Sequence, residues 1–283
     1  MVQIEESMQT AKQKKDPHAE QNAAVEKSLG RIKQKLIVMS GKGGVGKTST
    51  SVNLAIALAN KGYQVGIMDV DLHGPDVPRM LGLKGMLDIS KNSNKLAPMN
   101  RMDNLKVVSI ESLTMSKDDA IIWRGPIKFS AIKQFIGDVD WGDLDFLIID
   151  SPPGTGDEPL TIAQTIQDAK AIIVTTPQEV SLADVRKSIS FCKTVNMEIF
   201  GVIENMSGFV CPHCGESVDI FGTGGGEKTA AAASIPFLGR IPMDPRVVAC
   251  GDDGCSIQEK YADSTVAIAL GEIADKVAAL VKP

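Results

Sequence analysis

The chain has 283 residues, of which 43% are hydrophobic and 23% are charged, and its formal net charge is −5. This acidic balance argues against a broad phosphate-neutralising surface, so nucleic-acid binding is not expected. Membrane insertion is not expected either, because no apolar run approaches the roughly 20 residues needed to cross a bilayer and the first residues lack the apolar core of a secretory signal. The five cysteines, an odd number, are typical of a reducing cytoplasm, where thiols bind metals or carry out redox chemistry.

Two regions differ in texture. Residues 1–33 are polar and mixed in charge, and we predict an N-terminal extension there, with a mobile tail favoured over a peripheral helix. Residues 34–283 are predicted to form one domain in which apolar runs alternate with helix-like segments. The runs are 35–39, 64–69, 105–110, 145–150, 171–176, 199–205 and 236–241, and the helical segments are 47–60, 127–137, 158–168, 180–195, 226–233 and 257–281. Most runs lack polar alternation, as strands buried on both faces do. The pattern predicts an α/β fold with a doubly wound, mainly parallel sheet flanked by helices.

The segment SGKGGVGKTS (40–49) matches the phosphate-loop pattern G-x-x-x-x-G-K-[ST] from Gly41 to Thr48. It follows a predicted buried strand and opens a predicted helix, a context that separates this motif from a glycine-rich turn. Its backbone N–H groups are expected to face phosphate oxygens, Lys47 to bridge the β- and γ-phosphates, and Thr48 to bind Mg²⁺. The predicted nucleotide-binding residues of the loop are Gly41, Lys42, Gly43, Gly44, Val45, Gly46, Lys47, Thr48 and Ser49.

Acidic side chains follow two other predicted strands. Asp69 and Asp71 lie at the end of one run, and two acids beside a triphosphate can orient the attacking water and hold Mg²⁺ indirectly. Asp150 ends the run FLIID, which has the form of a Walker B strand with one carboxylate in the outer shell of the metal. The following segment SPPGTGD (151–157) combines stiff prolines with free glycines, so we predict a loop that moves as a γ-phosphate comes and goes.

Lys42 is a second lysine that an ordinary phosphate loop does not require, and by itself it fits a solvated surface charge. With it, the loop resembles that of the deviant-Walker-A P-loop NTPases, the SIMIBI-type superfamily of ParA, MinD and nitrogenase reductase. The resemblance implies a homodimer around ATP in which Lys42 acts on the partner subunit's nucleotide. It also implies that Asp71 positions the attacking water and that Asn205, at the end of the 199–205 run, contacts adenine. A simple turn asparagine is the competing interpretation of Asn205. The segment IPMDPRV (241–247) is expected to form part of the base pocket.

Cys211 and Cys214 form a CxxC pair in GFVCPHCGES (208–217). Four interpretations compete: a structural zinc knuckle, which needs two more ligands from the same chain; a thioredoxin-like redox pair; a buried chance pair; and half of a site shared by two subunits. Cys250 and Cys255 could complete a zinc site only if the fold brought them near, and they are otherwise interpreted as small buried residues. Under a two-fold axis, two CxxC pairs supply the four thiolates of a [4Fe–4S] cluster.

Six segments together closely resemble the Mrp/ApbC family of iron–sulfur cluster carrier ATPases, over about residues 30–283. They are the phosphate loop with Lys42, DVDLHGPDVP (69–78), WRGP (123–126), DSPPGTGDE (150–158), ENMSGFVCPHCG (204–215) and IPMDP (241–245). The resemblance implies a weak ATPase with ATP and Mg²⁺ as cofactors. It also implies a homodimer that holds a [4Fe–4S] cluster at Cys211 and Cys214 and transfers it to apoproteins.

Two other functions remain open from the sequence. A MinD- or ParA-like ATP-switched spatial regulator would bind a membrane or DNA, but residues 262–283 lack the basic face of a membrane anchor and the chain is acidic. A nitrogenase-reductase-like electron donor would take its cluster cysteines from two separate loops rather than from one CxxC.

Overall fold

The computed structural model describes residues 17–71, 74–90, 93, 95–113, 125–211 and 213–281. Residues 1–16 of the predicted tail, residues 123–124 of the WRGP segment and residue 212 of the CxxC motif lie outside these ranges. The described strands are β1 Ile32–Met39, β2 Val65–Asp69, β3 Asp88–Ile89, β4 Leu96–Ala97, β5 Met99–Met102, β6 Leu105–Ser109, β7 Leu144–Asp150, β8 Lys170–Thr175, β9 Glu198–Val210, β10 Ser217–Val218 and β11 Phe237–Met243.

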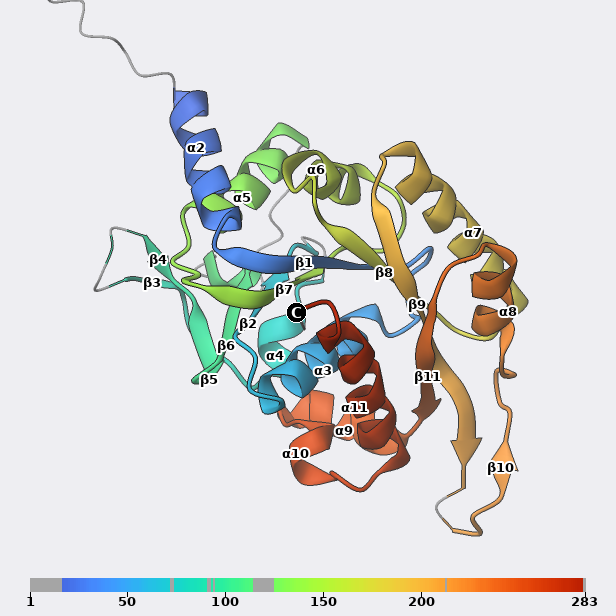
Figure 1. Cartoon of the computed structure of the whole chain (residues 1–283). Coiled ribbons are helices and arrows are strands. Elements are labelled where there is room, and N and C mark those ends of the chain that lie inside the picture. Colours follow the sequence, from blue (N-terminus) through green and yellow to red (C-terminus); the bar gives the residue numbers. More distant parts are fainter. Residues whose placement is uncertain are drawn as a thin grey trace, which may run out of the picture.

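A nine-stranded sheet forms the centre of the described chain, in the order β10-β9-β8-β1-β7-β2-β6-β5, with β11 also paired to β9 (Figure 1). The pairings of β1 with β7 and β8, of β2 with β6 and β7, and of β9 with β8 and β11 are parallel. β5 and β10 add antiparallel edges, while β3 and β4 form a separate small pair. The seven apolar runs of the sequence correspond to β1, β2, β6, β7, β8, β9 and β11.

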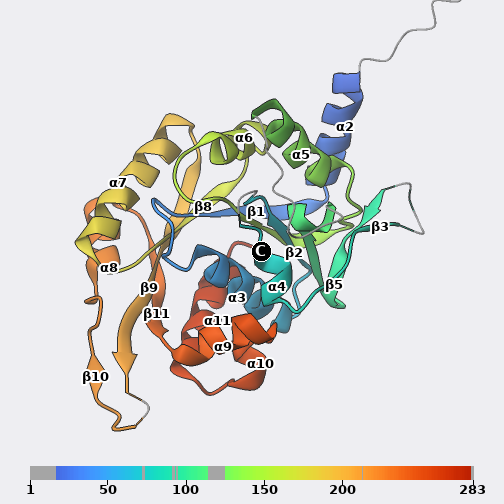
Figure 2. The same ribbon diagram turned by 180° about the vertical axis from the view of Figure 1, so that it is seen from behind.

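Helices cover both faces of this sheet (Figure 1, Figure 2). One layer holds α3 Lys47–Asn60, α4 Val77–Met80, α9 Pro245–Asp253, α10 Ile257–Lys260 and α11 Thr265–Ala278. The other holds α2 Pro17–Leu29, α5 Gly125–Gly137, α6 Asp157–Thr165, α7 Glu179–Thr194 and α8 Gly225–Ala232. This arrangement confirms the predicted doubly wound α/β fold. None of the described helices combines the length and the apolar character that a membrane span requires.

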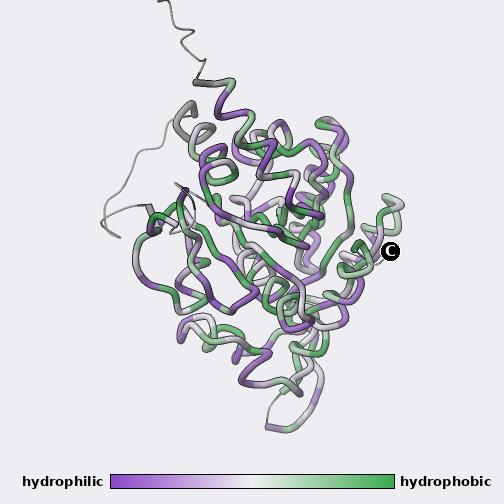
Figure 3. The backbone as a smooth tube through the Cα atoms, turned by 60° about the vertical axis from the view of Figure 1, so that its left-hand side comes forward, coloured by the Kyte–Doolittle hydropathy of each residue, from purple (hydrophilic) through white to green (hydrophobic). Residues whose placement is uncertain are grey.

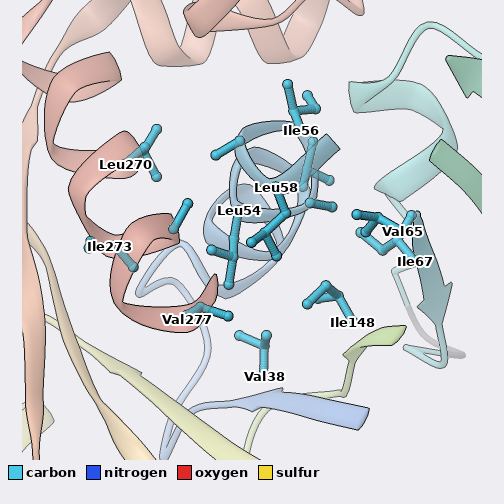
Figure 4. Packing of buried hydrophobic residues seen from close by; sticks show 14 of the residues in the cluster. Val38, Leu54, Ile56, Leu58, Val65, Ile67, Ile148, Leu270, Ile273 and Val277 are labelled. Atoms are coloured by element: carbon cyan, nitrogen blue, oxygen red, sulfur yellow. The ribbon is translucent and has the colours of Figure 1, made fainter. Parts of the chain in front are cut away.

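Each central strand contributes side chains to two hydrophobic cores, which explains why the runs lack polar alternation. On β1, Leu36 and Val38 pack under α3 and α11, whereas Ile37 and Met39 face the opposite layer. Successive strand residues point to opposite faces of a sheet, so a sheet covered on both sides needs apolar residues at every position. Figure 4 shows the first core, with Leu54 of α3 lying above Val38.

The predicted N-terminal extension contains a helix where a mobile tail was favoured. Residues 17–29 form α2, which packs against α5, and Ile32 begins β1. Val25 is 5% exposed and lies 3.3 Å from the position of a Cβ on Gly137. Because Gly137 has no side chain, Val25 packs directly on α5, so the weak apolar face of α2 suffices to hold the helix there.

The CxxC pair lies on a hairpin that the sequence did not predict. β9 continues past the expected end at Asn205 to Val210, and its end pairs antiparallel with β10. Met206 and Gly208 have positive φ values of 55° and 77°, which break the regular strand pattern that sequence reading relies on. The hairpin extends beyond the body of the protein in every view (Figure 1, Figure 2, Figure 3).

Candidate functional site

The phosphate loop lies between β1, a central strand of the sheet, and α3. Gly44 and Gly46 have φ values of +80° and +79°, in the left-handed region that favours glycine. Lys47 begins α3, so the unpaired N–H groups of the first helical turn can bind an anion. The loop borders a cavity of about 240 Å³, lined by Ser40, Lys42, Gly43, Gly44, Val45, Gly46, Lys47, Thr48, Ser49, Asp71 and Pro153. Gly41 packs against α7 instead, because a Cβ there would lie 2.4 Å from the Asp184 carbonyl oxygen.

Asp150 is fully buried at the end of β7 and links the residues predicted to meet phosphate and metal. Its Oδ1 accepts hydrogen bonds from Lys47 Nζ at 2.8 Å and Ser51 Oγ at 2.6 Å, and its Oδ2 accepts one from Thr48 Oγ1 at 2.8 Å. Ser51 was not predicted. It lies four residues after Lys47 and therefore on the same side of α3, which is the pattern that could have identified it. The hydroxyl and carboxylate oxygens gathered here are donors that Mg²⁺ prefers.

Asp69 and Asp71 occupy different environments although they are two residues apart. Asp69 is fully buried, faces Asp150 across the β2–β7 pairing, and accepts hydrogen bonds from the backbone N–H groups of Asp71 and Val77. Burial, and then the charge of Asp150, raise the pKa of Asp69 well above its usual value. Asp71 instead lines the cavity of the phosphate loop. Asp69 therefore holds the backbone of the turn that places Asp71 at the cavity.

The loop after β7 is attached to the phosphate loop. Ser151 Oγ donates to the Val38 carbonyl at 2.9 Å, and the Gly154 N–H donates to the Ser40 carbonyl at 2.8 Å. Pro153 lines the phosphate cavity, and Gly154 has a φ of +91°. A change in the cavity can therefore act directly on residues 151–157, the segment predicted to respond to a γ-phosphate.

A second cavity of about 530 Å³ adjoins the first, since both are bordered by Gly46 and Ser49. Its walls come from α3, α4, the middle of β9, β11, α9 and α11. Asn205 lies in its wall and donates from Nδ2 to the Val45 carbonyl at 2.9 Å. A Cβ on Gly46 would lie 2.2 Å from the same Nδ2, so this glycine is required for the contact. The predicted base-pocket segment contributes Ile241, Pro242, Met243, Asp244 and Val247; Asp76, Arg79 and Met80 of the α4 region were not predicted.

The Cys211 and Cys214 thiols lie at the tip of the β9–β10 hairpin, where Cys211 is partly exposed and Cys214 is exposed. Backbone N–H groups of Cys214 and His213, followed by the Cys214 thiol, lower the pKa of Cys211 by hydrogen bonding to its sulfur. Gly215 has a φ of +74° and donates its N–H to the Cys211 carbonyl at 2.8 Å, which closes the turn. Such a turn prepares a thiolate to bind a metal.

No third ligand accompanies these cysteines among the residues that the structure describes. Within that part of the chain, no group of three or more His, Cys, Asp or Glu side chains is arranged to hold a metal ion. Cys250 and Cys255 lie elsewhere, at the end of α9, so they do not complete a zinc site with the hairpin in the described fold. The interpretation of a buried chance pair does not fit, because Cys214 is exposed.

Comparison with known proteins identifies relatives over most of the chain. The ParA sequence model described as "NUBPL iron-transfer P-loop NTPase" matches residues 31–278. A cytosolic Fe-S cluster assembly factor NUBP2 homolog of Trichoplax adhaerens is 47% identical over 253 residues, covering 88% of this chain and 95% of that protein. An iron-sulfur cluster carrier protein of Methanocaldococcus jannaschii is 50% identical over 237 residues, covering 83% and 81%.

Solved structures with a similar fold include a nucleotide-binding protein and a cell division ATPase. A nucleotide-binding protein from Archaeoglobus fulgidus, in complex with ADP, has a TM-score of 0.73 and 38% identity, covering 82% of this chain and 91% of its own. The cell division ATPase MinD of Pyrococcus furiosus has a TM-score of 0.64, covering 88% of this chain and 100% of its own, but it is only 22% identical. That second similarity shows the fold alone.

Proposed function

Because the chain belongs to the NUBPL iron-transfer P-loop NTPase family, we propose that it is an ATP-dependent carrier of iron–sulfur clusters, with the cluster as cargo rather than as a resident cofactor. The observation that carries the proposal is the combination on β9. Asn205 of this strand meets the phosphate loop, and the same strand ends six residues later at an exposed CxxC pair. One strand thus joins a nucleotide cavity to a pair of thiols.

The cargo is proposed to be a [4Fe–4S] cluster held by Cys211 and Cys214 of each of two identical subunits. A cluster of this type is bound by four thiolates, and one hairpin supplies two. The described part of the chain offers the pair no further ligand, and the hairpin extends from the body where a second copy has access to it. A two-fold axis at the hairpin supplies the missing two thiolates.

The nucleotide is proposed to be ATP with Mg²⁺. Lys47 leaves Asp150 to bind phosphate. Thr48 and Asp150 are the residues that would hold Mg²⁺, and when bound the ion would neutralise charge on the phosphates. Asp71 at the cavity orients the attacking water, Lys42 reaches the nucleotide of the partner subunit, and Asn205 positions the base. Hydrolysis is proposed to be weak in the absence of a client protein.

Nucleotide state is proposed to control the cargo through the dimer. Loss of a γ-phosphate releases the 151–157 loop, whose Gly154 is hydrogen-bonded to Ser40 beside the phosphate loop. A change in the subunit interface then alters the separation of the two CxxC pairs. Four thiolates on one cluster tolerate little displacement, so the cluster passes to an apo iron–sulfur protein. The carrier is proposed to act in the cytoplasm, with neither membrane nor nucleic acid as partner.

The test is anaerobic reconstitution with iron and sulfide, followed by transfer to an apo-enzyme with and without ATP. The Cys211→Ser, Cys214→Ser variant should lose bound iron to background while it still binds ATP. The Cys250→Ala, Cys255→Ser variant is the matched control, because it removes the same number of thiols away from the hairpin, and it should keep its iron. Unchanged iron in the hairpin variant, or iron bound by a strict monomer, would overturn the assignment. Absence of iron together with ATP-dependent binding to vesicles or DNA would favour the spatial regulator.

A further inference from the structure

A second pair of cysteines lies at the carboxyl end of α9, outside the proposed cluster site. Cys250 is 2% exposed, and Cys255 is partly exposed. Gly254 between them has a φ of +69°, and the Cys255 N–H donates to the Cys250 carbonyl at 2.9 Å. This is a Schellman cap, in which the side chains of the two residues joined by that backbone hydrogen bond commonly contact each other. Both of those side chains are thiols here.

The geometry fits a disulfide. The hydrogen bond of 2.9 Å joins the Cys250 carbonyl oxygen, which is two bonds from its Cα, to the Cys255 backbone nitrogen, which is one bond from its Cα. The Cα atoms therefore lie within the separation of about 4.4–6.8 Å that disulfides span. Burial, and then a hydrogen bond between the two thiols, raise the pKa of Cys250 to about 11, in agreement with this placement. Cys255 is the more exposed of the two, so an oxidant in solution meets its sulfur first.

The pair adjoins the base cavity. α9 contributes Val247, Val248 and Gly251 to the wall of the 530 Å³ cavity. The cap packs closely on the turn that follows α4, since even a Cβ on Gly254 would lie only 2.5 Å from the Cα of Gly82. It therefore has little room to move in that direction. A bond that draws the two sulfurs from contact to about 2.0 Å must therefore be accommodated by the last turn of α9. That turn carries the cavity wall.

We propose that Cys250 and Cys255 form a reversible disulfide that weakens nucleotide binding in the base cavity. A small disulfide such as oxidised glutathione is the oxidant. The Cys255 thiolate attacks one of its sulfurs and releases one glutathione thiolate. Cys250 then loses its proton to solvent and attacks the Cys255 sulfur of the mixed disulfide, which releases the second glutathione. Two protein thiols are oxidised and one small disulfide is reduced, and excess thiol reverses the sequence.

The experiment uses the full chain with Cys211→Ser and Cys214→Ser, so that the hairpin thiols cannot react and the result does not depend on cluster binding. The protein is oxidised with glutathione disulfide, mapped by peptide mass spectrometry and titrated with a fluorescent ADP analogue. A cross-link between residues 250 and 255 is expected, with at least threefold weaker binding that dithiothreitol restores. Cys192, which is fully buried and has a pKa raised to about 12, should stay reduced.

Adding Cys255→Ser to the same protein is the matched control, because this position is partly exposed and tolerates the hydroxyl better than buried Cys250 does. Oxidation of that variant should leave its affinity for the ADP analogue unchanged. The proposal is overturned if no link between residues 250 and 255 forms, if the linked protein binds the analogue as tightly as the reduced protein, or if the Cys255→Ser variant loses affinity on oxidation to the same extent.

Discussion

Replacing Asp150 with asparagine removes the negative charge that Lys47 contacts. The side chains of Lys47 and Asp150 are 6% and 0% exposed, and their atoms are 2.8 Å apart. Breaking a buried ion pair by removing one partner costs about 3–5 kcal/mol, because the other charge stays buried and unpaired. Asparagine keeps an oxygen that can accept the 2.6 Å bond from Ser51, so the loss concerns charge more than hydrogen bonding.

Asp69 should compensate for part of this loss. Its pKa is raised by burial and then by the charge of Asp150, so neutralising residue 150 lowers that pKa and lets Asp69 ionise near Lys47. We therefore expect Asp150→Asn to lower the free energy of unfolding by about 2–4 kcal/mol at neutral pH. Urea unfolding of the nucleotide-free protein measures this value, and an unchanged m-value shows that the unfolded state is unaffected.

A double-mutant cycle with Asp69→Asn tests the compensation. Asp150→Asn should cost more in the Asp69→Asn background than in the natural chain, because no second carboxylate is then available to Lys47. Costs that add within about 0.5 kcal/mol would show that the two carboxylates act independently. A loss below about 1 kcal/mol for Asp150→Asn alone would refute the reasoning from a buried ion pair.

Three further predictions can be measured on the same protein. Gly46→Ala should unfold at a lower urea concentration than Gly44→Ala, its matched control. Both substitutions impose a left-handed backbone strain of about 1–2 kcal/mol, but only the Cβ at residue 46 meets Asn205. The raised pKa means that folded Asp69 holds a proton that the unfolded chain releases above about pH 4. The stability of the natural chain relative to Asp69→Asn should therefore fall as pH rises from about 4 toward that raised pKa. Urea titrations measure this difference, and a flat difference over the range would contradict the prediction. Glu204→Gln should destabilise the chain by about 1–3 kcal/mol, because the buried carboxylate accepts hydrogen bonds from Ser207, Gly224 and Gly226. Faster hydrogen exchange in residues 207–218 should accompany the loss.

The strands of the fold were predictable because they are buried on both faces. Most of the seven runs have apolar side chains at consecutive positions, and two cores receive them alternately, whereas β11 is interrupted by Gly239 and exposed Arg240. The α9 helix was not predicted, because its sequence PRVVACGDD is short and ends in glycine and aspartate, which are typical of loops. Its start is nevertheless readable, since Asp244 caps it by accepting from the Arg246 N–H and Pro245 occupies the first turn.

Local motifs predicted which residues line the 240 Å³ cavity better than which residues reach a cavity through tertiary contact. The loop from Lys42 to Ser49 lines one cavity because its residues are adjacent in the chain. Arg79 and Met80 reach the 530 Å³ cavity only because α4 packs against α9, which no spacing in the sequence indicates. The hairpin escaped prediction for a different reason. Its strand passes through Met206 and Gly208, whose positive φ values are typical of turns rather than strands.

Met206 and Gly208 also mark the place where the hairpin can bend relative to the body of the protein. Asn205 and Glu204 are neighbours on β9 and point to opposite faces; Asn205 holds the Val45 carbonyl, while Glu204 holds the glycine-rich start of α8. The strand is therefore fixed at this level on both faces. Beyond it, Met206 and Gly208 leave the regular strand conformation, and about 20 Å of extended chain separates Asn205 from Cys211. Bending at residues 206–208 can thus displace the thiols while the contact of Asn205 with the Val45 carbonyl stays in place, because a small rotation at the base of a long strand becomes a large displacement at its tip.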